Sequence, residues 1–269
     1  NGAAVCIFCD EWGSAAYHQQ REKPVREQIQ INREAIRKRY RAEKFLIYFQ
    51  AYTSTFGRFR ELEYFYKEAL KEKDVVGIVV GTRPDCLPKR VLQKFSEIAR
   101  ENYLSVELGV QTFDDAQLQF LSRGHDSASS LKAIRKLKTL PDINLCVHLM
   151  FGLPDETDAQ IRKTAEILSE QKVDGVKLHN LHVLRNTPLE KLYRESHFKP
   201  VDLEEYSRKV ALFLENLSPK IAVHRLAAVA SRWDELVAPQ WTREKMKTTQ
   251  FIDDFLSAKE TWQGRCFEV

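Results

Sequence analysis

The sequence predicts an α/β fold, a partial (β/α)6 barrel of the TIM type with a small carboxy-terminal extension. Short, continuous apolar runs recur along the chain, as expected for strands that are buried on both faces. Each run leads into polar residues and then into a stretch of helical length, which is typical of βα units around a parallel sheet. No glycine-rich dinucleotide turn follows the first run, and this favours a barrel over an open two-sided sheet.

The expected elements follow one another in a regular order. A helix with apolar spacing is predicted over 25–43, and later helices after Pro88, from about Asp114 and up to Leu168, the last capped by Thr157 and Asp158. We expect strands at 45–49, 75–80, 104–108, 143–150 and 175–183.

The pattern changes at residue 201. A helix over 203–217, a short strand at 221–224 and a tail containing Trp233, Trp241 and Trp262 are interpreted as an extension packed on the barrel. We therefore expect a core barrel over 1–200 and an extension over 201–269. Because the chain begins with Asn1 rather than Met and a cysteine pair precedes any strand, the first of six strands is expected upstream of Asn1.

Composition limits the function. The 42 Lys and Arg residues nearly balance the 38 Asp and Glu residues, so the net charge of +4 does not by itself indicate nucleic-acid binding. The basic run 37–39 is interpreted as a solvated helix face. The five cysteines are an odd number, and Cys86, Cys146 and Cys266 lie far apart in the sequence, which argues against a disulfide framework and favours the reducing cytoplasm. No run reaches the roughly 20 apolar residues needed to span a bilayer, so a soluble protein without a membrane or disulfide partner is expected.

Two cysteines, Cys6 and Cys9, stand three positions apart near the start of the chain. Such a pair is typical of half a zinc site, of a redox pair or of two ligands of an iron-sulfur cluster. A zinc site would need two further ligands, and His18 is the only candidate close in sequence. The spacing alone leaves these alternatives open.

A series of later motifs makes the chain resemble a known family. It resembles the radical S-adenosylmethionine (radical SAM) superfamily, in the branch of the elongator catalytic subunit and coproporphyrinogen dehydrogenase, and looks most like the YhcC-like bacterial family of predicted iron-sulfur oxidoreductases. The motifs cover nearly the whole chain in the same order and are Tyr48-Phe49-Gln50-Ala51-Tyr52-Thr53, Gly81-Thr82-Arg83-Pro84-Asp85, Glu107-Leu108-Gly109-Val110-Gln111-Thr112, Arg123-Gly124-His125-Asp126, Gly152-Leu153-Pro154-Asp155-Glu156-Thr157, Lys177-Leu178-His179, Thr187-Pro188-Leu189 and His224-Arg225-Leu226.

The resemblance implies a [4Fe-4S] cluster that reductively cleaves S-adenosylmethionine to a 5'-deoxyadenosyl radical, which abstracts hydrogen from the substrate. Cys6 and Cys9 match the last two cluster cysteines, and the first is expected about a dozen residues earlier, upstream of Asn1. The resemblance also implies an external electron donor of the flavodoxin or ferredoxin type. The substrate, a small molecule or an RNA-linked group, is not identified by the sequence.

The resemblance further implies a binding site for S-adenosylmethionine. Arg123 matches the guanidinium that pairs with the methionyl carboxylate, while Gln111 and Glu107 are expected near the ribose and sulfonium. The alternative is that Arg123 caps the preceding helix. Gly152 and Leu153 are expected to present backbone groups to adenine, although the same residues suit an ordinary strand-to-helix turn.

The remaining candidates lie at other strand ends. Thr53 and Ser54 occupy the position where relatives hold the methionyl amine, although the usual Gly-Gly-Glu-like motif cannot be recognised in the sequence there. Thr82 and Arg83 are expected to face the cup formed by the strand ends. Histidines on apolar strands are more often core groups than ligands; the substrate-site candidates are His148, His179, His224 and Arg225.

Two functions of other classes are alternatives to the radical enzyme. A non-catalytic barrel could bind RNA through its basic helix and the tail tryptophans, although the polar residues gather at strand ends rather than on one face. A zinc-stabilised structural protein would contain zinc and lack absorbance near 400 nm.

Overall fold

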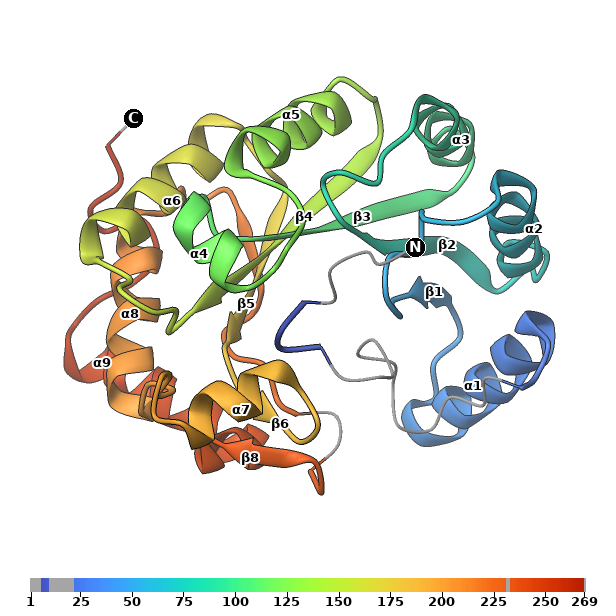
Figure 1. Cartoon of the computed structure of the whole chain (residues 1–269). Helices are drawn as coiled ribbons and strands as arrows, with labels where there is room; N and C mark the ends of the chain where they lie inside the picture. Colours follow the sequence, from blue (N-terminus) through green and yellow to red (C-terminus); the bar gives the residue numbers. More distant parts are fainter. Residues whose placement is uncertain (1–5, 10–21, 231–232, 269) are drawn as a thin grey trace.

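Six parallel strands form one sheet that curls into a half-barrel (Figure 1). The computed structural model describes residues 6–9, 22–230 and 233–268. The order across the sheet is β1-β2-β3-β4-β5-β7, so the strands follow the chain from one edge to the other. These strands are β1 (Phe45–Phe49), β2 (Val75–Thr82), β3 (Tyr103–Gln111), β4 (Ile143–Phe151), β5 (Gly175–Asn180) and β7 (Ala222–Arg225).

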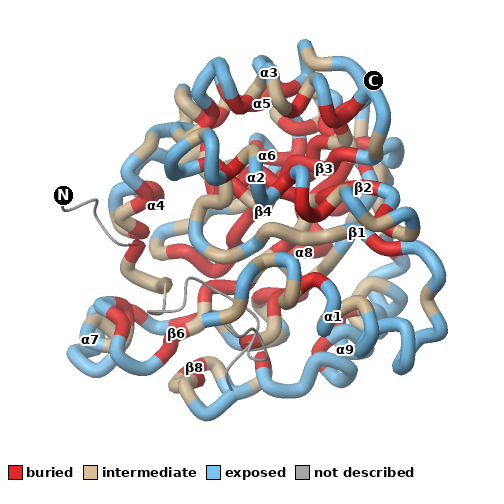
Figure 2. The backbone as a smooth tube through the Cα atoms, turned by 90° about the vertical axis from the view of Figure 1, so that its right-hand side faces the viewer, coloured by how far each residue is buried: buried red, intermediate tan, exposed pale blue. Residues whose placement is uncertain are grey.

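Helices cover the convex face of this sheet, and residues 6–9 lie on its concave side (Figure 1). In β3, Leu104, Val106 and Leu108 are fully buried beneath the helices, while the alternating positions face the concave side. Figure 2 shows the buried strands enclosed by helices whose outer faces are exposed. The helices are α1 (Val25–Tyr40), α2 (Phe59–Ala69), α3 (Lys89–Ala99), α4 (Asp115–Phe120), α5 (Ser127–Lys138), α6 (Asp158–Glu170), α7 (Pro188–Arg194), α8 (Leu203–Asn216), η1 (Gln240–Arg243) and α9 (Lys245–Ala258).

Side-chain caps start several of these helices where the sequence predicts a start. Thr157 caps α6, and the side chain of Gln160 returns the bond to the Thr157 backbone, which completes a capping box. Asp114 caps α4 at its predicted start, and Asp126 caps α5, whose start the sequence does not predict separately. Each aspartate accepts a hydrogen bond from the backbone amide three residues later, without a capping box. Within the described ranges, no helix has both the length and the apolar character needed to cross a membrane.

The predicted strand over 175–183 is wrong in its second half. β5 ends at Asn180, whose buried side chain accepts a hydrogen bond from the Ala228 amide. The chain turns there, and β6 (Val183–Leu184) pairs antiparallel with β8 (Leu236–Ala238) in a separate two-stranded sheet. Apolar residues continue past the break at Leu181, Val183 and Leu184, and they conceal it because all three are buried.

The short strand at 221–224 also differs from its expected place. As β7 it pairs parallel with β5 and is the sixth strand of the described sheet, whereas the sequence assigns it to an extension packed on the barrel. The core sheet therefore continues beyond residue 200. α8 forms the helical crossover to β7, and Leu212, Phe213 and Leu214 join the main hydrophobic core.

Candidate functional site

The cysteine pair lies in a tight turn at the mouth of the half-barrel, drawn dark blue between α4 and α7 in Figure 1. The Cys9 amide donates to the Cys6 carbonyl over 3.1 Å. Between the cysteines, the Ile7 amide donates to Leu121 O, and Ile7 O accepts from the Leu189 amide at the start of α7. Because the first amides of a helix lack partners within it, this bond satisfies α7 and fixes the turn.

The Arg123 side chain joins this turn to the carboxyl end of β3. Its Nη1 donates to Cys6 Sγ over 3.1 Å, and its Nη2 donates to Gly109 O over 2.8 Å. Neither acceptor is a carbonyl at the end of α4, so these bonds do not support the alternative in which Arg123 caps that helix. Its Nε is buried and has no partner among the described residues, so this N–H group can donate to a bound ligand.

Glycines allow two polar side chains to approach Arg123. A Cβ at Gly109 would lie 3.1 Å from both Arg123 Nη2 and Gln111 Nε2, so this glycine makes room for the guanidinium and the amide together. Gln111 has a φ of 72° at a bulge between β3 and β4, which turns its side chain away from the regular alternation. The structure thus brings Cys6, Gln111 and Arg123 together at one strand end.

Arg83 extends this group from the neighbouring strand end. A Cβ at Gly124 would lie 2.9 Å from Arg83 Nη2, so this guanidinium packs directly on the residue after Arg123. Arg83 also forms a bidentate ion pair with Asp85, in which Nε donates to Oδ1 over 2.9 Å and Nη2 donates to Oδ2 over 2.7 Å. Two guanidinium groups therefore lie beside the cysteine turn, as expected for a site that holds an anionic group.

The surroundings of Cys6 favour its thiolate. The pKa of Cys6 is lowered to about 5, because Cys9 hydrogen-bonds to it and Arg123 and Arg83 lie nearby, which outweighs the opposite effect of burial. A thiolate is the form in which cysteine binds metals. The pair fits two positions of an iron-sulfur cluster, although the described ranges contain no group of three His, Cys, Asp or Glu side chains that could hold a metal. His18 lies outside those ranges.

A second polar group lies deeper on the concave face, around Glu107. One carboxylate oxygen is paired with Lys177 Nζ, and the other accepts bonds from the Tyr48 hydroxyl at 2.5 Å and from His148 Nε2 at 2.7 Å. Burial alone would raise the pKa of Glu107, but the bonds from His148, Lys177 and Tyr48 lower it to about 2. Both oxygens of the Glu107 carboxylate therefore have partners, and Glu107 lies two residues before Gly109.

His179 and Arg225 adjoin this group. The Arg225 guanidinium hydrogen-bonds to His179 Nε2 and donates from Nε to Leu178 O over 3.3 Å, and the rings of His148 and His179 are 5.7 Å apart. Burial, with Arg225 adjacent, keeps the pKa of His179 well below its usual range.

The fourth substrate-site candidate, His224, lies apart from the other three. It is exposed and packs over Gly175, where a Cβ would be 2.7 Å from His224 Nε2.

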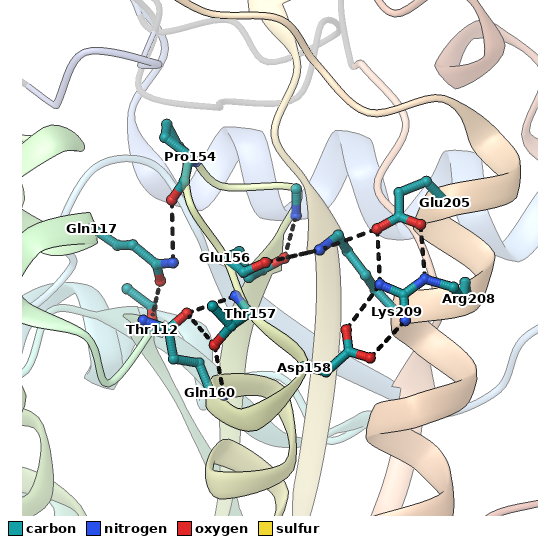
Figure 3. Close-up of polar contacts among 11 residues, drawn as sticks. Thr112, Gln117, Pro154, Glu156, Thr157, Asp158, Gln160, Glu205, Arg208 and Lys209 are labelled. Carbon is teal, nitrogen blue, oxygen red and sulfur yellow. Dashed lines mark hydrogen bonds and ion pairs between the residues drawn. The ribbon is translucent and has the colours of Figure 1, made fainter.

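The turn that begins at Gly152 is held in place by a buried carboxylate. Gly152 has a φ of 83° and packs against Val201, and its amide donates to Glu156 Oε2 over 2.9 Å. Lys209 from α8 lies 3.3 Å from the same carboxylate, as Figure 3 shows. Burial raises the pKa of Glu156 to about 7 despite these partners. Gly152 and the buried Leu153 therefore form a rigid strand-to-helix turn.

The threonine and serine candidates are used within the fold. Ser54 Oγ donates to Phe49 O over 3.0 Å, and the Ser54 amide donates to Gly81 O. Thr82, expected to face the cup, is instead buried and bonded to Thr55, on the face of β2 that packs under the helices. Thr53 lies in the same turn, and its carbonyl accepts from the Phe56 amide.

The sequence interpretation missed two members of the concave group, Tyr48 and Lys177. Both lie inside motifs of the resemblance but were assigned no role. A lysine within an apolar strand, at a position that pairs with His148, was the available signal. The alternation of β5 places Lys177 and His179 on the same face, and register with β4 brings them beside His148.

Comparisons with known proteins agree with this architecture. A parallel half-barrel with a cysteine turn held at its carboxyl edge defines the radical SAM class of enzymes. Residues 3–168 match the Radical SAM superfamily, and residues 173–257 match the Radical_SAM C-terminal domain. The chain therefore belongs to the radical SAM superfamily, as a radical SAM enzyme whose substrate is not identified. Membership implies an iron-sulfur cluster, S-adenosylmethionine and an external reductant.

Within the superfamily the chain is similar to Protein YhcC of Escherichia coli, with 34% identity over 95% of this chain and 81% of that protein. Its fold is similar to that of Methanocaldococcus infernus Elp3, with a TM-score of 0.76 and 18% identity over 89% of this chain. The match spans 60% of that Elp3 chain. Streptococcus suis SuiB bound to S-adenosylmethionine gives a TM-score of 0.56 and 15% identity over 82% of this chain and 48% of that one.

Proposed function

We infer that Cys6 and Cys9 hold a [4Fe-4S] cluster with a third thiolate, and that this enzyme uses S-adenosylmethionine as a radical source. When bound and reduced, the cluster supplies the electron that cleaves S-adenosylmethionine to a 5'-deoxyadenosyl radical, which abstracts hydrogen from the substrate. The observation that carries this proposal is the bond from Arg123 to Cys6, since it joins the cysteine turn to the strand end where the cofactor is expected.

The side chains around Arg123 are proposed to bind S-adenosylmethionine. Arg123 pairs with the methionyl carboxylate through the donor that has no partner, and Gln111 lies beside it to bind the polar part of the cofactor. Arg83 adds a second positive charge. Gly152 and Leu153 form the turn against which adenine packs, and Thr53 and Ser54 line the loop at the end of β1.

The concave face below this site is proposed to receive the substrate. His148, His179 and Arg225 meet there, whereas His224 is exposed on Gly175. Glu107, expected near the sulfonium, is bonded to Lys177, Tyr48 and His148, so it organises the substrate side of the barrel. Flavodoxin or ferredoxin is the proposed electron donor.

Anaerobic reconstitution of the full-length protein tests this function. With iron, sulfide, a reductant and S-adenosylmethionine, the protein is expected to bind about four irons and release 5'-deoxyadenosine. Cys6→Ala and Cys9→Ala should abolish product and lower the iron content, while Cys266→Ala, at an exposed cysteine, should retain both. Reconstituted wild-type protein without iron, or with zinc in its place, would contradict the proposal.

A further inference from the structure

The concave face carries an excess of positive charge that the fold does not neutralise. In the deeper group around Glu107, the charged side chains in the described part of the chain are the carboxylate of Glu107 and the cations Lys177 and Arg225. Glu107 is occupied at both oxygens by Lys177, Tyr48 and His148. Arg225 forms no ion pair with any carboxylate that the structure describes, since its partners are His179 and Leu178 O.

The other titratable groups on this face do not cancel the excess. Burial raises the pKa of Cys146 to about 12 and raises the pKa of Tyr48, so neither carries a negative charge near neutral pH. Burial also lowers the pKa of His148 and His179, so both imidazoles are neutral there. The face therefore keeps one net positive charge at Arg225. Burying half of a guanidinium without a carboxylate partner costs folding free energy unless a ligand supplies the missing negative charge.

A β-bulge directs Arg225 to this place. Val176 pairs with Val223, but the next residue of β5, Lys177, pairs with Arg225, so His224 is the extra residue. Bulges recur beside active sites, where they redirect one side chain. Here the redirected side chain is the guanidinium, which reaches His179 instead of following the alternation of the strand.

Solvent reaches these groups from the open side of the half-barrel. The side chain of Lys177 keeps 19% of its surface exposed and that of His148 keeps 18%, so a ligand can contact both. Glu107 lies two residues before Gly109, and at about 3.3 Å per residue the group lies roughly 7 Å below the Arg123 contact. A substrate held by Arg225 would extend toward the cysteine turn.

We propose that Arg225, with His179 and Lys177, binds an oxyanion of the substrate, a carboxylate or a phosphate, on the concave face. The assignment of this ligand as the substrate rests on the proposed radical function. Arg225 supplies a planar pair of donors that suits either group, and the imidazole of His179 holds the guanidinium in position. Lys177 contributes a second cation at the rim of the same site.

Ligand-detected NMR tests the anion site without requiring turnover. Line broadening of inorganic phosphate and of ¹³C-acetate is measured with the reconstituted wild-type protein at constant ionic strength. We expect at least one anion to bind, and Arg225→Gln to weaken it by about tenfold or more, the loss typical of a hydrogen bond to a charged group. The matched control Arg185→Gln, at an exposed arginine, should bind as the wild type does.

The outcome for each anion separates the two ligand chemistries. Phosphate alone would identify a phosphate-bearing substrate, and acetate alone a carboxylate. Binding of neither anion, or equal binding by wild type and Arg225→Gln, would overturn the proposal. Should Arg225→Gln not fold, Glu107→Gln takes its place, because removal of the one carboxylate that the structure describes in this group should tighten anion binding by about threefold or more. Unchanged or weaker binding would overturn the proposal.

A separate assay of 5'-deoxyadenosine in the wild-type protein keeps the two proposals apart. Anion binding that depends on Arg225, in a protein that forms no 5'-deoxyadenosine, would leave the anion site standing and contradict the radical function. Formation of 5'-deoxyadenosine without anion binding would contradict only the anion site.

Discussion

Arg123 donates a hydrogen bond from Nη1 to the sulfur of Cys6 over 3.1 Å, across 117 positions of the sequence. The same guanidinium is anchored on Gly109 O at the end of β3. Arg123 thereby connects the cysteine turn to β3, one of the two central strands of the sheet, and its buried Nε has no partner among the described residues. A change at Arg123 should therefore affect the cofactor site before it affects the rest of the fold.

Arg123→Met should weaken the binding of S-adenosylmethionine by about tenfold or more, because a charged hydrogen-bonding group at the proposed carboxylate position is lost. Equilibrium dialysis with reconstituted protein measures the affinity. Arg90→Met, at an exposed arginine on α3, is the matched control and should not change it. An unchanged affinity in Arg123→Met would remove Arg123 from the cofactor site.

Tyr48→Phe should lower the free energy of unfolding by about 1 to 2 kcal/mol, because the Glu107 carboxylate loses one of its three partners while remaining buried. Urea titration followed by tryptophan fluorescence measures the change. Tyr64→Phe, at a tyrosine that is 52% exposed, should have little effect. Equal stabilities of wild type and Tyr48→Phe would show that the hydroxyl bond contributes nothing.

Glu156 should make stability depend on pH near neutrality. Burial raises its pKa from the usual 4.5 to about 7, so the folded state binds this proton more tightly than the unfolded chain does. Its contribution is fully present below pH 4.5 and is lost as the pH rises through 7. Glu156→Gln cannot ionise, so between about pH 5 and 8 it should lose less stability than the wild type, by up to about 3 kcal/mol.

Urea titrations at both pH values provide that measurement. Glu166→Gln, at an exposed glutamate of the same helix, should follow the wild type. Parallel pH dependence of the wild type and Glu156→Gln would mean that Glu156 stays ionised throughout, paired with Lys209.

Gly152→Ala should destabilise the fold by about 2 kcal/mol or more, because the new Cβ would meet Val201 at 2.7 Å in a backbone conformation with a φ of 83°. Thermal unfolding measures the effect. The double variant Gly152→Ala, Val201→Ala removes the steric contact but not the backbone strain, so it should cost less than the sum of the two single changes. Full additivity would show that Val201 does not limit this position.

The apolar runs of the sequence predict β1 to β4, because strands buried on both faces leave a continuous signal. The sequence also predicts the starts of α3, α4 and α6, whereas it does not predict α2. The signal fails where burial continues through a change of direction, as at Asn180 between β5 and β6. It is also weak at β7, a strand of four residues whose exposed and half-buried positions alternate. The sequence predicts this short strand, but its place as the sixth strand of the sheet follows only from its pairing with β5.

The sequence identifies only some of the residues of the candidate site. The motifs mark Cys6, Gln111 and Arg123, and the structure brings them together as expected. They do not reveal that Thr82 points under the helices or that Tyr48 and Lys177 complete the bonding of Glu107. These relationships depend on which face a side chain takes and on strand register, which motif spacing does not encode.

The extra residue at His224 ties the chemistry of the barrel interior to the length of its last strand. Without the bulge, His224 would pair with Lys177, and Arg225 would take the opposite face of the sheet and leave His179. Relatives could thus gain or lose a charge inside the barrel through the presence or absence of this bulge, with no substitution on the concave face. Aligning them requires the gap at 223–225 to be placed by strand register rather than by residue identity.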